Sequence, residues 1–203
     1  MSEPPAERAD RIGPNAILQV IAAVRERGGE GAVAALLRRA GLEARLARPI
    51  EGLVPVAEVR ALHAALIELA GLASARNIAA DAGRRTAAYL LAHRIPRFFQ
   101  RLLAVLPRPL RQRLLLATIA RHAWTFTGGG SFRLEPGAPP GLVIDPCPLC
   151  PDRGRDGLGC VYYAATFDAL LRRLVDPRTN VEPAACGAAG SRHCALRIER
   201  LSA

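Results

Sequence analysis

Five cysteines, all in the last third of the 203-residue sequence, are the residues whose types and spacing most clearly indicate chemistry. Cys147 and Cys150 lie in "DPCPLCPDRG", Cys160 begins a helix-like run, and Cys186 and Cys194 flank a glycine-containing turn. A helix N-terminus favours a thiolate because its free amides and macrodipole lower the thiol pKa, so Cys160 is placed as a ligand or a reactive thiol. Clustered cysteines in a reducing compartment indicate metal or redox chemistry before structural disulfides.

A zinc site is the chemistry that this set of cysteines predicts. Zn²⁺ takes four sulfur, nitrogen or carboxylate ligands in a tetrahedron, and Cys160, Cys186 and Cys194 would supply three of them. The fourth is open between Glu182, four residues before Cys186, and the alternates Cys147 and Cys150 of the "CPLC" pair. In the competing interpretation, Cys160 and Cys186 are small buried apolar residues, Cys194 starts a strand, and the "CPLC" pair is incidental or redox-labile.

Charge and composition limit the classes of partner. The formal net charge is +10 and every basic residue is an arginine, but the arginines are scattered from Arg8 to Arg200 without basic-aromatic interleaving, which argues against nucleic-acid binding. The acidic, proline-rich start "MSEPPAERAD" lacks the features of a secretory signal, so we expect a cytoplasmic protein. No apolar run reaches the roughly 18 residues that a transmembrane helix needs, which leaves peripheral membrane contact open.

Periodicity predicts an α+β fold with N-terminal helices packed on a C-terminal antiparallel sheet that contains an inserted helix. We expect a flexible tail over 1–13 and one domain over 14–203, divided into a helical part, 14–124, and a second region, 125–203. Helical patterns stop at "RGGEG" and at Gly71, and prolines interrupt them at 96, 107 and 109. "SFRLE" and "LVID" read as strands, a helix follows from Cys160, and "TNVEPAAC" with "HCALRIERL" reads as a hairpin turning over 187–192.

The C-terminal third resembles the 4-vinyl reductase domain family, small-molecule-binding modules of bacterial aromatic sensors and tetrapyrrole biosynthesis. The residues that carry the resemblance are "GLGCVYYAATFDALL" and the hairpin "VEPAACGAAGSRHCALRI", which contains Glu182, Cys186, Gly190 and Cys194. "RIGPNAILQVIAAV" and "VPVAEVRALHAAL" extend the likeness to the family of bacteriochlorophyll biosynthesis J proteins, often named bacteriochlorophyll 4-vinyl reductases. The resemblance therefore covers nearly the whole chain.

The resemblance implies a fold like that of vesicle-tethering complex subunits, and zinc held by three cysteines and a glutamate. Those ligands would be Cys160, Cys186, Cys194 and Glu182. The family's acidic ligand usually precedes its cysteine by three residues, where this chain has Pro183. Because an offset of one residue turns a strand side chain to the other face, Glu182 reaches the metal only if Pro183 creates a bulge, and otherwise Cys147 or Cys150 would substitute.

A magnesium tetrapyrrole is the ligand that the resemblance implies, and it needs an apolar slot and often an axial ligand. We expect His122, on the apolar Leu115 and Ile119 face of its helix, to be the axial ligand, and His93 is the second candidate. The alternative for each is a core histidine bonded to a backbone carbonyl. Trp124, Tyr163 and Phe167 are candidate pocket walls, with a core role as the alternative for the latter two. The arginines between 94 and 113 are expected to form a solvated face, from which one or two could pair with a propionate.

Two functions follow from the resemblance. The first is a carrier or accessory protein that binds divinyl protochlorophyllide or a Mg-porphyrin between the helices and the sheet and presents it to bacteriochlorophyll biosynthesis enzymes, with a structural zinc. The alternative is an 8-vinyl (4-vinyl) reductase. Hydride transfer needs a cofactor, and "TGGGSF" follows a helix and leads into a strand, which is the wrong context for a dinucleotide-binding turn. A homodimer stays open.

Overall fold

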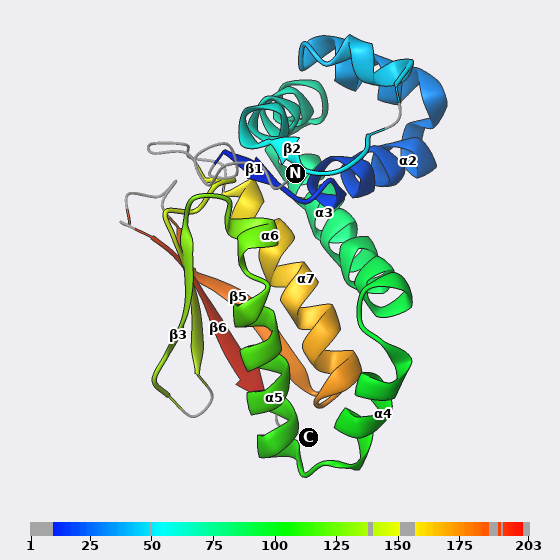
Figure 1. The fold of residues 1–203 in the computed structure, drawn as a ribbon. Coiled ribbons are helices and arrows are strands. Elements are labelled where there is room, and N and C mark those ends of the chain that lie inside the picture. Colours follow the sequence, from blue (N-terminus) through cyan, green and yellow to red (C-terminus); the bar gives the residue numbers. More distant parts are fainter. Residues whose placement is uncertain are drawn as a thin grey trace, which may run out of the picture.

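The computed structural model describes residues 10–48, 50–137, 140–150, 157–186, 191 and 193–200. The fold is α+β, as the periodicity predicted, with helices in the N-terminal part and an antiparallel sheet in the C-terminal part (Figure 1). The helices are α2 (Asn15–Arg39), α3 (Val56–His93), α4 (Arg97–Val105), α5 (Arg108–Arg121), α6 (Trp124–Thr127) and α7 (Leu158–Leu174), with a 3-10 turn, η1, over Glu43–Leu46. The strands are β1 (Arg11–Ile12), β2 (Val54–Pro55), β3 (Ser131–Glu135), β4 (Gly141–Asp145), β5 (Thr179–Ala185) and β6 (Cys194–Arg200).

A strand lies inside the segment 1–13 that the sequence predicts to be a flexible tail. Strand β1 pairs antiparallel with β2, and the Ile12 side chain is buried in the core. The Gly13 amide also donates a hydrogen bond of 2.7 Å to the Thr125 carbonyl. Residues 10–13 therefore belong to the fold, because the Ile12 side chain is part of the core. Residues 1–9 lie outside the described residues.

Glycines break the long helices where the sequence indicates a stop. Gly29 inside α2 has φ 68° and Gly71 inside α3 has φ 74°, both in the left-handed region that favours glycine. The chain resumes helical geometry directly after each of them. What the sequence predicts as separate helices are therefore paired segments joined at a single non-helical residue.

The main sheet has the strand order β3-β4-β6-β5, and all its neighbouring strands are antiparallel. β3 and β4 lie at the expected residues, and β5 and β6 form the expected hairpin; Gly190 and most of the turn over 187–192 lie outside the described residues. β3 and β5 are the edge strands. The β5–β6 register shifts between Pro183 and Ala185, so a bulge lies beside the proline.

Helix α7 lies between the sheet and α3 and forms the centre of the molecule (Figure 1). Gly83 of α3 permits this close approach, because a Cβ at that position would lie 2.4 Å from the Tyr162 carbonyl oxygen. The Thr166 hydroxyl donates to the Gly83 carbonyl, and the Thr86 and Tyr162 hydroxyls hydrogen-bond to each other at 2.8 Å. The α3–α7 interface is therefore a packed core and not a slot for a large ligand.

Helix α4 and the start of α5 lie at the end of the molecule remote from β1 and β2, and α5 runs from there to α6, which contacts β1 (Figure 1). Proline precedes both helices, as expected from the prolines at 96 and 107. Phe99 and Leu106 pack against the core and Leu103 is buried in it, whereas the opposite side of α4 faces outward. No helix among the described residues is both long enough and apolar enough to cross a membrane.

Candidate metal centre and ligand site

Four cysteines from separate parts of the chain meet in the interior. The Sγ atoms of Cys150, Cys160, Cys186 and Cys194 all lie within 4.8 Å of one another. The Cys160 sulfur is 3.5 Å from that of Cys150, 3.0 Å from that of Cys186 and 3.2 Å from that of Cys194. All are free thiols. With metal–sulfur bonds of about 2.3 Å, the sulfurs of a tetrahedral site are roughly 3.8 Å apart, so the cluster has the size of such a site.

Each sulfur comes from a different segment, positioned by the sheet and by α7. Cys160 lies in the first turn of α7, Cys186 follows the last residue of β5, and Cys194 opens β6 opposite Ile144 of β4. Cys150 comes from the turn after β4. The structure places Cys160, Cys186 and Cys194 close together, and of the three residues proposed as the fourth ligand it adds Cys150 to the group.

Two glycines before Cys160 let the Cys150 loop approach the helix. Gly157 has φ 60° and adopts the left-handed conformation that starts α7. A Cβ on Gly159 would lie 2.5 Å from the Leu149 Cβ and 3.0 Å from the Cys150 sulfur, so only glycine fits there without movement of the loop. A glycine inside a helical pattern can indicate such a close approach, and the second glycine of "GLGC" is therefore a sequence signal for this packing.

Helix α3 also holds the cysteine loop. The Arg60 guanidinium donates a hydrogen bond of 2.6 Å from Nε to the Pro148 carbonyl, between the two cysteines of "CPLC". The ideal Cβ position at Gly157 lies 3.7 Å from both an Arg76 guanidinium nitrogen and the Cys186 sulfur, so a second α3 arginine is close to the cluster. The helical part of the chain thus helps to build the cysteine site.

The fifth cysteine, Cys147, is buried beside the cluster but outside the group of four. Hydrogen bonds to Cys150 and Cys194, together with burial, raise the pKa of the Cys147 thiol well above its usual range. The hydrogen bond with Cys150 lowers the pKa of Cys160. Hydrogen bonds with Cys194 and Cys186, together with burial, raise this pKa by more, so the net shift is upward. Burial and the neighbouring thiols therefore oppose the lowering of the Cys160 pKa that is expected from the helix N-terminus.

Glu182 lies apart from the cysteines. Its side chain is exposed, it stands opposite Arg197 in the β5–β6 ladder, and its carboxylate accepts a hydrogen bond of 2.8 Å from the Asn180 side chain. The bulge beside Pro183 begins after Glu182 in the chain. The bulge therefore does not bring Glu182 into the group, and Cys150 stands where the resemblance implied a glutamate.

The two histidines expected on apolar surfaces are exposed. His122 is the C-cap of α5, and its Nδ1 hydrogen-bonds to the Thr118 carbonyl oxygen at 2.8 Å. The helical face drawn from Leu115 and Ile119 does not continue to His122, because the backbone leaves helical geometry there. His93 lies near the end of α3 with its ring 4.8 Å from that of Tyr89. Neither imidazole lines an apolar slot.

The expected aromatic wall is mostly a core cluster. Phe167 packs edge-on against Phe126 and stacks on Phe132, and the Tyr163 hydroxyl donates a hydrogen bond of 2.6 Å to the Phe126 carbonyl. Burial raises the pKa of Tyr163 well above its usual range. Tyr163 and Phe167 therefore fix α7 against α6 and β3, whereas Trp124 is half exposed.

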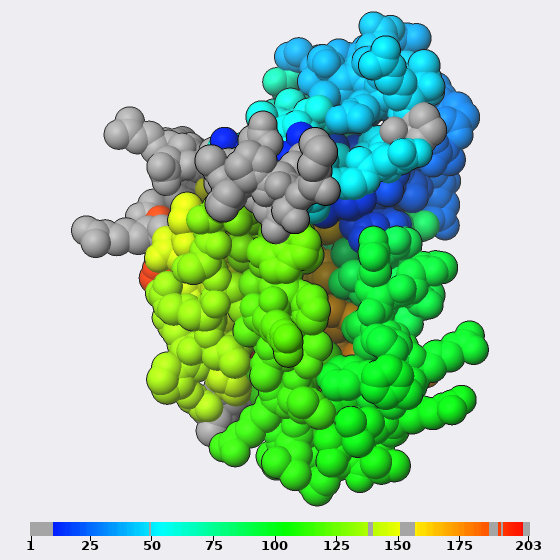
Figure 2. Space-filling model, viewed as in Figure 1, coloured from blue at the N-terminus to red at the C-terminus, as the bar shows by residue number. Residues whose placement is uncertain are grey.

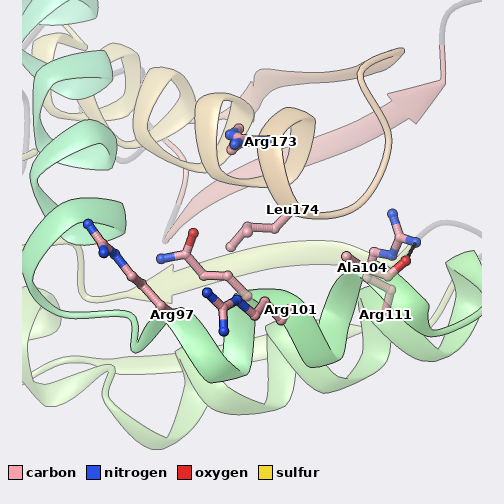
Figure 3. A pocket seen from close by; sticks show the side chains of 7 residues that line it. Arg97, Arg101, Ala104, Arg111, Arg173 and Leu174 are labelled. Carbon is pink, nitrogen blue, oxygen red and sulfur yellow. Dashed lines mark hydrogen bonds between the residues drawn. The ribbon is translucent and has the colours of Figure 1, made fainter.

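An arginine-rich cavity of about 280 Å³ lies between α4, α5 and α7 (Figure 3). Arg97 and Arg101 come from α4, Arg111 from α5, and Arg173 from the last turn of α7; Gln100, Ala104 and Leu174 complete the lining. Arg111 is fixed by hydrogen bonds to the Ala104, Leu106 and Val175 carbonyls. The sequence predicts a solvated face for most of these arginines. One sequence signal for a cationic cavity is the absence of any acidic residue between Asp81 and Glu135.

Two known proteins are similar to the chain over nearly its whole length. It is 38% identical over 190 residues to the bacteriochlorophyll synthase 23 kDa chain of Cereibacter sphaeroides, covering 94% of this chain and 91% of the relative. This chain belongs to that family. The bacteriochlorophyll synthase 23 kDa chain of Rhodobacter capsulatus is also 38% identical over 190 residues, covering 94% and 87% of the two chains. No family model matches the chain.

Membership of the bacteriochlorophyll synthase 23 kDa chain family confirms the resemblance to bacteriochlorophyll biosynthesis proteins. An alignment over 94% of the chain includes residues from both the helical part and the sheet. The similarity therefore extends beyond the cysteine hairpin and includes the helices that line the arginine-rich cavity, α4, α5 and α7. Both relatives are named as a chain of bacteriochlorophyll synthase.

Proposed function

We propose that this protein binds a magnesium tetrapyrrole and assists bacteriochlorophyll synthesis as a carrier or accessory protein. The observation that carries the proposal is the arginine-rich cavity between α4, α5 and α7. The names of both relatives supply the pathway. Chlorophyll precursors combine a large apolar macrocycle with carboxylate side chains, and a cluster of guanidinium groups beside exposed apolar residues matches both parts.

The cavity suits the carboxylate arm of such a ligand. Its volume of about 280 Å³ is below the roughly 300–1,000 Å³ of pockets that enclose a drug-sized ligand. In the proposed complex a propionate enters between Arg101 and Arg173, and the macrocycle lies across the mouth of the cavity on the surface of α4. Arg111 is already held by three carbonyls and so presents its charge without reorganisation.

This position differs from the pocket expected between the N-terminal helices and the sheet. Helix α7 fills that space, and the contact of Gly83 with Tyr162 leaves no room there for a macrocycle. A second cavity, of about 240 Å³, opens beside α3, α7 and β5 and is lined by Arg84, Asp168 and Asn180 among others. It offers one arginine and one carboxylate, so it is a poorer match for an anionic pigment.

We also propose that the cysteine cluster holds one structural Zn²⁺ through Cys150, Cys160, Cys186 and Cys194. Four protein thiolates close the coordination shell, so no position is left for a substrate. The bound cation would supply the positive charge that allows the buried thiols to ionise. Its effect would be to tie the β4–α7 loop, the start of α7 and the β5–β6 hairpin together. Cys160 and Arg173 are about 20 Å apart along α7, which separates this site from the proposed pigment site.

The pigment proposal is tested by absorption titration with Mg-protoporphyrin and with its dimethyl ester. The free acid should bind saturably, and the ester should bind at least roughly tenfold more weakly because it has no carboxylate for the arginines. Arg173→Gln should reduce the affinity for the free acid and leave that for the ester unchanged. Arg172→Gln is the matched control, because Arg172 is the adjacent residue on α7 and pairs with Asp168.

His122→Ala tests the earlier axial-ligand prediction in the same titration. His122 is about 16 Å along α5 from Arg111, so its loss should not alter the pigment spectrum. Equal binding of acid and ester, or no saturable change with either, would overturn the proposed site. A spectral change in His122→Ala alone would restore the histidine as the anchor.

A further inference from the structure

The outward face of α4 carries a row of apolar side chains that the fold leaves uncovered. Phe98, Leu102 and Val105 recur at helical spacing and are 71%, 45% and 79% exposed. Leu110 of the neighbouring helix α5 is 50% exposed. On its inward side, α4 packs against the core through Leu103 and Phe99, and the outward row of side chains does not contribute to the core. We call these four residues, Phe98, Leu102, Val105 and Leu110, the apolar ridge.

Arginines surround the apolar ridge. Arg97 and Arg101 stand directly before Phe98 and Leu102, and five exposed arginines belong to α4, its N-terminal flank and the first half of α5: Arg94, Arg97, Arg101, Arg108 and Arg113. Among the described residues, Arg94, Arg97, Arg101 and Arg113 form no salt bridge, while Arg108 pairs with Asp176. The whole stretch between Asp81 and Glu135 contains no acidic residue. This end of the molecule is therefore cationic with an apolar centre.

We propose that the α4–α5 end docks on the surface of an anionic lipid bilayer, with the apolar ridge entering the headgroup region and the arginines contacting lipid phosphates. Short amphipathic helices with aromatic and aliphatic residues on one side and arginine on the other bind in this way. Arginine side chains keep their charge at the phosphates while their stems lie along the apolar region.

The shape of this end favours a bilayer over a protein partner. The apolar ridge belongs to a projecting part of the surface, since α4 and the start of α5 form one extremity of the molecule (Figures 1 and 2). Lipid headgroups rearrange around a projecting ridge, whereas a protein would need a matching apolar groove lined by carboxylates. The exposed arginines match the negative phosphates of a bilayer, and Asp176, the acidic partner of Arg108, is itself buried.

The test is vesicle co-sedimentation of the full-length, pigment-free protein. Vesicles made of equal parts of phosphatidylcholine and phosphatidylglycerol should bind the protein, and pure phosphatidylcholine vesicles should bind it much less. Added NaCl should weaken the binding because salt screens the charges. Phe98→Ser with Val105→Ser should reduce partition at least roughly tenfold, because two large apolar side chains are lost from the interface.

Matched variants separate docking from general surface properties. Leu69→Ser with Leu72→Ser removes two exposed apolar residues from α3, at 53% and 40% exposure, and should leave vesicle binding unchanged. Arg94→Gln with Arg113→Gln avoids the arginine-rich cavity and should weaken binding to anionic vesicles by roughly fivefold for each charge. Thermal unfolding should be unaltered in all three variants, since every substituted side chain is exposed.

Two outcomes would overturn the proposal. One is equal sedimentation of the wild type and the Phe98→Ser, Val105→Ser variant with anionic vesicles. The other is a concentration-dependent dimer in analytical ultracentrifugation that the same variant dissociates, together with no vesicle binding by the wild type. The second result would assign the apolar ridge to a contact between two copies of the chain.

Discussion

The sulfur atoms of Cys160 and Cys186 lie 3.0 Å apart, although 26 positions separate the two residues. That contact joins the first turn of α7 to the end of β5, and Cys150 and Cys194 complete the group. The distance is too long for a disulfide, whose sulfurs are about 2.05 Å apart, and shorter than the roughly 3.8 Å between two thiolate ligands of one tetrahedral zinc ion, so metal binding would move these two sulfurs slightly apart.

We expect one zinc ion per chain. Cys186→Ser or Cys194→Ser should abolish stoichiometric zinc and lower the free energy of unfolding by roughly 3 kcal/mol, because metal binding and folding are coupled. Elemental analysis and thermal unfolding measure the two effects. Glu182→Gln should retain the metal, since Glu182 lies outside the cluster. The zinc site would be contradicted by wild-type protein that contains no metal and by cysteine variants whose melting temperature equals that of the wild type. Iron found in place of zinc would change the identity of the proposed metal.

Gly159→Ala should disturb the cysteine site without removing a thiol. The added Cβ would meet Leu149 and Cys150 at distances that require the loop to move, at a cost of about 1–3 kcal/mol. Zinc affinity measured by chelator competition should fall together with the melting temperature. Gly31→Ala in α2, where nothing lies within 4 Å of the new Cβ, is the control and should be neutral or slightly stabilising. An unperturbed Gly159→Ala protein would show that the loop is not packed as described.

Asp176 should stabilise the fold above acid pH. Its backbone hydrogen bond from Arg178 is the main cause that lowers the carboxyl pKa, and Arg178 and Arg108 add favourable charge. Since the pKa is lower in the folded state than in the unfolded state, the stabilisation is complete above the unfolded value and is lost as pH falls through the folded value.

The melting temperature of Asp176→Asn should therefore be below that of the wild type at neutral pH, and the difference should vanish in strong acid. Glu30→Gln, which removes an exposed pairing with Arg25, is the control and should change little at any pH. A difference between wild type and Asp176→Asn that is the same at every pH would rule out the ionised carboxylate as its cause.

The purified protein alone should not reduce a vinyl group. Gly128–Gly130 connect α6 to β3, and a dinucleotide-binding turn would instead connect a strand to a helix. Incubation with a divinyl protochlorophyllide and NADPH or reduced ferredoxin, followed by chromatography, should show no 8-ethyl product. Product formed in excess of one equivalent of protein would support the reductase alternative.

Local patterns predicted the elements better than they predicted the site. β3, β4 and the β5–β6 hairpin follow from alternation and turn residues, and the breaks at Gly29 and Gly71 follow from glycine. The sequence also predicted the grouping of Cys160, Cys186 and Cys194, because the ligands of one metal ion must converge. Whether Cys150 or Glu182 joins the cluster depends on the position of the bulge after Glu182 and on the close approach of the Cys150 loop to Gly159. Both are features of the tertiary structure.

The histidines show the limit of periodicity. A helical face can be extended from Leu115 to Ile119, but it ends where the helix ends, and His122 is the first residue beyond the last turn. Likewise, Phe98 is apolar and yet exposed, because α4 lies at the extremity of the molecule. Burial of a given side chain depends on which elements remain to cover it, and one helix in isolation does not contain that information.

The position of Pro183 has a consequence for aggregation. An edge strand exposes a row of amide and carbonyl groups to which a strand of another molecule can add. In β5 the proline has no amide hydrogen and the adjacent bulge interrupts the regular spacing, while the other edge, β3, carries Arg133 and Glu135. We therefore expect intermolecular strand addition to be disfavoured at one edge by backbone geometry and at the other by charge.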